Sequence, residues 1–135
     1  MLDTHVLVWA VEGDRRLGTN ARAAIEAAER AEAVGISAVT PWEIALLAER
    51  NRLRLVQEVG TWIEAVLALP GMRLMPIEPA VALDSVRLPG PFHADPADRL
   101  IIATARHSGA RLVTADGTIL SYAKRGHVDT IDARL

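Results

Sequence analysis

Four acidic residues stand at positions of this sequence where they could act together. Asp3 and Asp116 each follow a short apolar run, and Glu43 and Asp98 each lie near the start of a helical pattern. Carboxylates that converge raise one another's pKa values and destabilise the fold. A divalent cation offsets that repulsion, and carboxylates with retained waters are common ligands of Mg²⁺ and Mn²⁺. Such an ion activates water and neutralises charge on a phosphoryl group, so the acids predict metal-dependent phosphodiester chemistry.

Each acid also has a purely structural interpretation. Residues 40–43 have the form of a capping box, in which Glu43 reaches back to the first backbone N–H of the box. Asp95 is expected to cap a helix, and Asp98 then complements the dipole in the first turn. Asp3 can be a strand-end residue that faces solvent, and Asp116 followed by Gly117 is typical of a turn. Only the joint placement of the four acids favours a shared site.

Short apolar strands alternate with helical patterns along the chain, which predicts an α/β fold with a central, mostly parallel sheet. In the strand at 34–39 only Ser37 is polar, as is typical of a strand covered on both faces. Thr19 is a candidate N-cap, and 88–93 is expected to be a loop. The expected strands are 1–3, 34–39, 72–77, 111–114 and 128–131, and the expected helices are 4–11, 19–33, 40–51, 56–69, 79–86, 96–108 and 115–125.

These elements must bring the acids together. In open parallel α/β sheets, ligand sites lie beyond the carboxyl ends of the strands. Asp3 closes the first expected strand, Glu43 follows the second, and Asp116 follows the strand at 111–114. Asp98 opens a later helix, so all four positions can converge at one edge of the sheet.

Length and composition narrow the class of protein. A chain of 135 residues, half of them apolar, suits one domain with a real core. The net charge of −2 does not indicate nucleic-acid binding by the chain as a whole. The lack of cysteine excludes disulfides and cysteine-ligated zinc. No apolar run approaches the roughly 20 residues that span a bilayer, and no signal core opens the chain, so no membrane association and a cytoplasmic location are expected.

Four segments resemble the acidic motifs of PIN-domain ribonucleases, in family order and over almost the whole chain. The third segment is the most specific, and the subgroup that it resembles is the VapC-type toxins of toxin–antitoxin pairs. The segments are LDTHVLVW (residues 2–9), SAVTPWEIA (37–45), HADPADRLIIATA (93–105) and LVTAD (112–116).

The resemblance implies a single PIN-like domain over residues 1–135, with a central parallel sheet and helices on both faces. It implies cleavage of RNA with Mg²⁺ or Mn²⁺, leaving a 5′-phosphate and a 3′-hydroxyl. It also implies a homodimer and a small antitoxin whose tail covers the active site. Only Met1 and Leu2 precede Asp3, where relatives usually have a few more residues, so either the first strand is very short or the start is misassigned. The residues to which the resemblance assigns metal binding and catalysis are Asp3, Glu43, Asp98 and Asp116.

Other residues are candidates for supporting roles. The Thr114 hydroxyl can bond a carboxylate or pack ordinarily at a strand end, and Thr4 can cap the first helix with its hydroxyl facing the site. Asp95 is interpreted as a helix cap in preference to a metal ligand. Arg99 can bind RNA phosphate or pair with Asp95. The four histidines show no metal-ligand spacing. The tryptophans are expected to pack in the core, with Trp9 alternatively on a partner surface: Trp9, Trp42 and Trp62.

Two other functions are compatible with an α/β chain of this kind. A non-catalytic PIN-like scaffold would bind RNA or a protein without cleaving, and the four intact acids disfavour it. A phospho-acceptor receiver domain would need paired acids after the first strand and a lysine near the last strands. Asp3 stands alone and Lys124 lies at a helix end, so this alternative has little support. Metal-dependent cleavage of a generic RNA, with EDTA as control, separates these functions.

Overall fold

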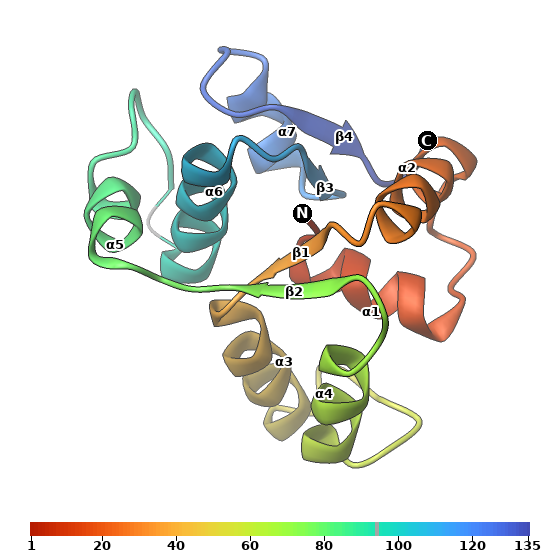
Figure 1. The fold of residues 1–135 in the computed structure, drawn as a ribbon. Helices are drawn as coiled ribbons and strands as arrows, with labels where there is room; N and C mark the ends of the chain where they lie inside the picture. Colours follow the sequence, from red (N-terminus) through yellow and green to blue (C-terminus); the bar gives the residue numbers. More distant parts are fainter. Residues whose placement is uncertain (94) are drawn as a thin grey trace.

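The computed structural model describes residues 1–93 and 95–135, and Figure 1 shows the path of the chain. Ala94, within the third of the four acidic segments, lies outside the described residues. No helix among the described residues is long and apolar enough to cross a membrane. The helices are α1 (Thr4–Glu12), α2 (Thr19–Arg30), α3 (Val39–Glu49), α4 (Val59–Leu67), α5 (Pro79–Val86), α6 (Pro96–Ser108) and α7 (Gly117–Ala123), and the strands are β1 (Val34–Ser37), β2 (Met72–Met75), β3 (Leu112–Thr114) and β4 (Thr130–Asp132).

The sheet is held together in its middle by one residue. β1 pairs with β2 and β3 pairs with β4, both in parallel. Leu2 forms a parallel bridge to Ile36 of β1 on one side and to Val113 of β3 on the other. The order across the sheet is therefore β2, β1, Leu2, β3, β4. The predicted parallel sheet is confirmed, and the expected strand at 1–3 is reduced to a single bridging residue.

Helices cover both faces of this sheet, as predicted. Adjacent residues of a strand point to opposite faces, and in β3 Leu112 and Val113 enter different clusters of buried apolar side chains. Val113 packs in the cluster formed largely by α1, α2 and α4, whereas Leu112 packs with α6 and α7. Figure 1 shows α3 and α4 together on one side of β2, with α5 and α6 side by side at the left of the view and α6 in contact with α3.

The boundary between β1 and α3 differs from the prediction and removes the capping box. The strand ends at Ser37, whose hydroxyl oxygen accepts a hydrogen bond of 3.2 Å from the backbone N–H of Val39. The helix begins at Val39, and its N-cap residue Ala38 makes no side-chain cap bond. Thr40 is therefore inside the helix and does not cap it, and Glu43 lies in the second turn.

Two other helix starts were also mispredicted. Gly18, not Thr19, is the N-cap of α2, and no side chain caps that helix. The helix expected from residue 56 begins at Val59, because the Glu58 carboxylate accepts bonds from the N–H groups of the first turn. In contrast, α5 has its predicted bounds, and α6 begins after Asp95 and ends at a left-handed Gly109, as predicted.

The segment after β4 returns to the start of α2 and packs tightly against it. Gly18 N–H donates to Ala133 O at 2.8 Å, and Ala21 N–H donates to Leu135 O at 2.9 Å. A Cβ atom on Gly18 would clash with the backbone carbonyl groups of Arg134 and Leu135. The absence of a side chain at this position is therefore what allows the close approach.

Gly18→Ala should lower the free energy of unfolding by about 1–3 kcal/mol, the usual cost of overpacking, because backbone atoms must move to admit the methyl group. Gly117→Ala is the matched control, since a Cβ there meets nothing within 4 Å and alanine favours a helix. Thermal unfolding of both variants measures the effect. Equal stability of the two variants would contradict the tight contact at Gly18.

Candidate active site

The four predicted acids line one cavity of about 320 Å³ at the carboxyl edge of the sheet. Asp3 follows the bridging Leu2, and Asp116 lies two residues after β3. Glu43 reaches the cavity from α3 and Asp98 from the first turn of α6. The expected convergence of the four side chains is confirmed. Asp95, His5 and Arg134 line the same cavity.

Asp3 is the most firmly held of the four acids. It is buried, and its Oδ1 accepts a 2.8 Å bond from the backbone N–H of Thr4. Its Oδ2 accepts a 2.6 Å bond from the hydroxyl of Thr114, which itself accepts from the backbone N–H of Asp116 at 3.0 Å. Burial raises the pKa of Asp3, and these hydrogen bonds oppose that rise. The Thr114 hydroxyl therefore bonds a carboxylate of the site, which was one of its two predicted roles.

Thr4 does not cap the first helix as predicted, because Asp3 is the N-cap and Thr4 is the first helical residue. The Thr4 hydroxyl is fully buried and lies 3.2 Å from the hydroxyl of Thr40 in α3. This contact joins α1, which Asp3 caps, to α3, which carries Glu43. Thr40, expected to be a cap, instead fixes the position of α3 against α1.

Glu43 carries the clearest sign that the cavity is made for a ligand. Its Oε1 is buried and has no hydrogen-bond partner among the described residues. Burial raises the pKa of Glu43, the nearby Thr4 hydroxyl lowers it, and the charge of Asp3 raises it further. A buried polar atom without a hydrogen-bond partner lowers the stability of the fold unless a bound ligand, ion or water supplies that partner.

Asp98 experiences the combined repulsion of the site. Its pKa is raised to about 8, first by burial and then by the charges of the other carboxylates, which are Asp3, Asp95, Asp116 and Glu43. The Asp98 Oδ2 lies 3.1 Å from Nε2 of His93, and its backbone N–H donates to the Asp95 carboxylate at 3.0 Å. Asp95 is thus a helix cap, as interpreted from the sequence, although it also faces the cavity.

Asp116 combines a structural contact with its place in the site. Its Oδ1 accepts bonds from the backbone N–H groups of Thr118 and Ile119, so it is the N-cap of α7. A cap role and a ligand role are compatible here, because one carboxylate oxygen faces the helix and the second remains for another partner. The turn expected from the sequence at 116–117 is therefore a helix start.

The four acids that line the cavity have the chemistry of divalent cation ligands, but their side chains are not close enough together to coordinate an ion. Within residues 1–93 and 95–135, no group of three histidine or acidic side chains could hold a metal ion as it stands. The carboxylates are instead held by caps, a hydroxyl and an imidazole. The orphaned oxygen of Glu43 and the mutual repulsion at Asp98 both fit a hard cation, which prefers oxygen ligands.

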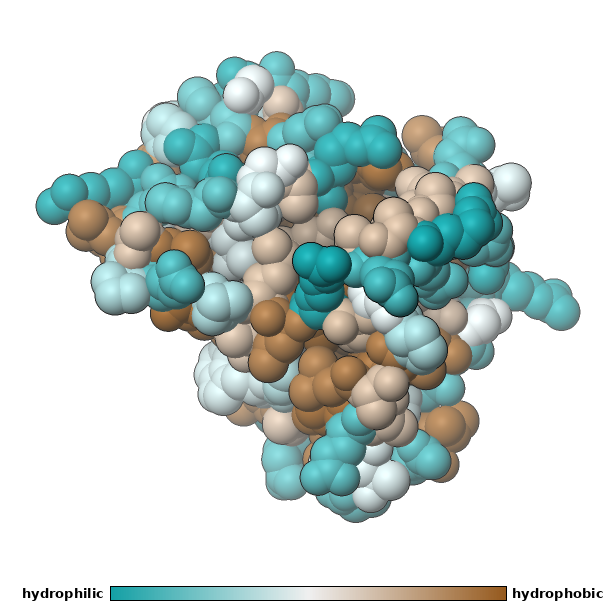
Figure 2. Space-filling model, in the orientation of Figure 1, coloured by the Kyte–Doolittle hydropathy of each residue, from teal (hydrophilic) through white to brown (hydrophobic). Residues whose placement is uncertain are grey.

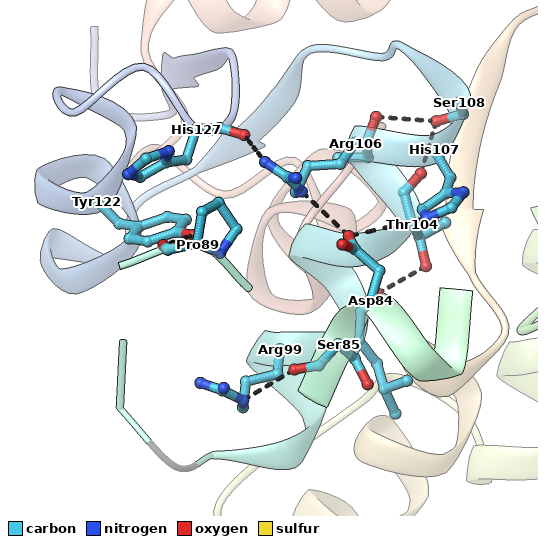
Figure 3. Close-up of polar contacts among 12 residues, drawn as sticks. Asp84, Ser85, Pro89, Arg99, Thr104, Arg106, His107, Ser108, Tyr122 and His127 are labelled. Atoms are coloured by element: carbon cyan, nitrogen blue, oxygen red, sulfur yellow. Dashed lines mark hydrogen bonds and ion pairs between the residues drawn. The ribbon is translucent and has the colours of Figure 1, made fainter. Parts of the chain in front are cut away.

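Of the two roles predicted for Arg99, pairing with Asp95 is not seen among the described contacts, and contact with RNA phosphate stays a prediction. Figure 3 shows its side chain directed at Ser85, whose carbonyl oxygen accepts from Nε at 2.9 Å. The same guanidinium donates to the carbonyl groups of Phe92 at 3.2 Å and of Val86 at 3.4 Å. Arg99 therefore fastens the segment between α5 and α6 and does not pair with Asp95 among the described contacts.

The prediction for the tryptophans is right for two of three. Trp9 and Trp62 are buried, but the side chain of Trp42 is 57% exposed on α3. The sequence also did not single out His5, His93 or Arg134 as site residues. Proximity to Asp3 was a usable signal for His5, whereas nothing in the sequence places Arg134 beside the acids.

Comparison with known proteins gives matches over nearly the whole chain. Residues 1–125 match the PIN domain family. The chain is 39% identical over 122 residues to Ribonuclease VapC22 from Mycobacterium tuberculosis (strain ATCC 25618 / H37Rv), covering 90% of each chain. A crystal structure of VapBC2 from Rickettsia felis, bound to a DNA fragment from their promoter, superposes with a TM-score of 0.67. That match covers 97% of this chain and 96% of the other, and at 14% identity it shows the fold alone.

Asp98→Asn should alter stability in a pattern that separates a shared cation site from a helix cap. The pKa of Asp98 is about 8 in the folded chain against 3.8 ordinarily. The folded chain therefore holds a proton on Asp98 at pH values where the unfolded chain has released it. The resulting contribution to stability is fully present below the ordinary pKa and is lost as pH rises through about 8. In EDTA, we expect the stability of the wild type relative to the variant to fall between about pH 4 and pH 8.

Addition of Mg²⁺ or Mn²⁺ should then stabilise the wild type more than Asp98→Asn. Binding to the native state contributes roughly 2.7 kcal/mol at a hundredfold excess over Kd. Thermal unfolding of both proteins, in EDTA and in millimolar metal, measures the difference. A first-turn acid alone would cost on the order of 0.3–1 kcal/mol when removed, equally with and without metal, and that result would rule out the shared site.

Proposed function

Because this chain belongs to the PIN domain family, we propose that it is a metal-dependent endoribonuclease and the toxin of a toxin–antitoxin pair. The observation that carries the proposal is the gathering of Asp3, Glu43, Asp98 and Asp116 in one cavity. The similarity to a ribonuclease over 90% of each chain supports the substrate class. We take residues 1–135 as one PIN-like domain acting in the cytoplasm, as the sequence leads us to expect.

The cavity supports a division of roles among its acids. Asp3, Asp98 and Asp116 would hold Mg²⁺ or Mn²⁺, partly through water, and Glu43 would hold a second ion or orient the attacking water. When bound, such a cation activates water and neutralises charge on the phosphoryl group. The unpartnered Oε1 of Glu43 is a ready acceptor for a proton of that water.

The proposed reaction is hydrolysis with in-line geometry. A water oxygen bonds to phosphorus and gives up a proton to a carboxylate of the site, while the bond from phosphorus to the 3′ oxygen breaks and that oxygen takes a proton from solvent. The products are a 5′-phosphate and a 3′-hydroxyl. Thr114 keeps the Asp3 carboxylate fixed through its 2.6 Å bond, and the contact between Thr4 and Thr40 fixes α1 against α3. These residues act by positioning the acids and do not touch the substrate.

Asp116→Asn and Glu43→Gln should each reduce the kcat for cleavage of a generic RNA by on the order of 100-fold or more, with little change in stability. Asparagine keeps the cap of α7, and Glu43 caps nothing, so the loss reports the missing charge. Glu49→Gln, at the exposed end of the same helix, is the matched control for Glu43. Cleavage is followed with Mg²⁺ or Mn²⁺ and with EDTA.

Wild-type rates in either site variant would remove that residue from the catalytic set. Failure of the wild type to cleave any RNA with either metal would instead favour the non-catalytic PIN-like scaffold. That alternative predicts RNA or protein binding that none of the acid substitutions abolishes.

The proposal includes a homodimer and a cognate antitoxin that covers the acidic cavity. Large apolar side chains are exposed on several neighbouring elements, and Val86 of α5 is 74% exposed. Figure 2 shows hydrophobic side chains gathered below the centre of the view, where β2, α3 and α4 lie in Figure 1. Such exposed surface favours association over a monomer. The exposed apolar residues of these elements and of α5 are Trp42, Leu74, Leu83 and Val86.

We expect sedimentation at micromolar concentration to show a dimer, and Val86→Glu to shift it towards the monomer by burying a charge in the contact. Val11→Glu is the control, because Val11 is exposed but belongs to α1, outside β2, α3, α4 and α5. A wild type that is monomeric throughout, or equal behaviour of the two variants, would contradict a dimer contact through α5.

A further inference from the structure

A second cavity, of about 250 Å³, adjoins the acidic one and has no role in the proposed hydrolysis. One wall is the segment 91–93, which carries the rings of Phe92 and His93. The opposite wall is a face of α7 and the residue after its C-cap, where Thr118, Ser121 and Arg125 are exposed. We call this cavity the α7 cleft.

The α7 cleft and the acidic cavity are linked by two direct contacts. His93, in the cleft, lies 3.1 Å from the carboxylate of Asp98. Thr118, also in the cleft, donates its backbone N–H to Asp116 at 2.8 Å. A chain bound with its phosphate at the acids would therefore have its next residue beside the cleft.

The walls of the cleft are fastened before any ligand binds. The Tyr122 hydroxyl donates to Pro89 O at 2.6 Å, as seen in Figure 3, and Arg125 donates to Pro91 O at 3.1 Å. Arg99 holds the carbonyl of Phe92 from the other side. The ring of Phe92 packs edge-on against Tyr122, with centroids 4.9 Å apart. A site that is already formed loses less entropy when it binds a ligand.

The chemistry of the cleft matches one component of RNA. Aromatic rings stack on unpaired bases, and this contact tolerates different sequences. A guanidinium interacts with both a phosphate and a base plane, and hydroxyl groups bond to base edges. The chain carries a net charge of −2 and its acids repel phosphate, so Arg125 offers a local attraction that the whole surface does not.

Resting on the function proposed above, we propose that the α7 cleft binds one unpaired base of single-stranded RNA, next to the phosphate that is cleaved. The base lies between the segment 91–93 and α7, with Ser121 and Thr118 at its edge and Arg125 at its phosphate or face. A base in a duplex is stacked on both faces and paired at its edge, so only an unpaired base is free to enter the cleft.

The test measures binding in EDTA, so that it does not depend on cleavage. The probe is a short, fluorescently labelled oligoribonucleotide, together with versions that carry one abasic position at each place in turn. Anisotropy gives the Kd of each probe for the wild type and for Ser121→Leu, which fills the cleft from an exposed helix position. Arg125→Ala is the second variant, and Lys124→Ala, which removes a neighbouring charge outside the cleft, is its control.

For the wild type, loss of the base at one position should raise Kd by about tenfold, the size of one stacking contact. Ser121→Leu should bind the intact probe with a Kd about tenfold higher than that of the wild type, and its Kd should not change when the probe is abasic at that position. Arg125→Ala should weaken binding more than Lys124→Ala. The proposal is overturned if no abasic position distinguishes the wild type from Ser121→Leu, or if the two charge variants behave alike.

The same proteins separate this proposal from the proposed function. Base-dependent binding without cleavage in Mg²⁺ or Mn²⁺ would refute the nuclease and keep the cleft. Cleavage of RNA without base-dependent binding would keep the nuclease and refute the cleft.

Discussion

Repulsion among carboxylates is the constraint around which this molecule is organised. Asp3, Glu43, Asp98 and Asp116 share one cavity, and the fold must hold them there before any ligand arrives. Each acid but one is given a local partner: a threonine hydroxyl for Asp3, an imidazole for Asp98 and helix N–H groups for Asp116. Glu43 keeps a buried oxygen without a hydrogen-bond partner among the described residues, so the burial of this carboxylate is not fully offset by the protein.

The supports of these acids also build the surrounding structure. The hydroxyl of Thr114 joins Asp3 to the backbone after β3, and His93 joins Asp98 to the segment that forms one wall of the α7 cleft. Arg99, the residue after Asp98, fixes that segment through its bonds to the carbonyl groups of Ser85 and Phe92. Stability and site geometry therefore depend on the same few contacts, and a change in one is felt in the other.

The sequence was most informative where local chemistry and tertiary packing agree. Asp95, Pro96 and Gly109 mark the ends of α6 correctly, because cap, proline and left-handed glycine act within one turn of chain. The capping box at 40–43 failed because the Ser37 hydroxyl starts α3 earlier, which leaves Thr40 for a buried contact with Thr4. The convergence of the acids followed from parallel strands, but the partners of Arg99 and the place of Arg134 depend on contacts between distant segments that no local pattern encodes.

The bridge at Leu2 has a consequence for the order in which the protein is made. Asp3 and Thr114, whose hydrogen bond holds the Asp3 carboxylate, are 111 residues apart in sequence. Asp3 is synthesised long before β3, and the edge of Leu2 that faces β3 stays unpaired until residues 112–114 have been made. A nascent chain therefore cannot display all four carboxylates in one cavity. The acidic centre is therefore complete only after residue 116 has been synthesised, and no shorter nascent chain carries all four acids.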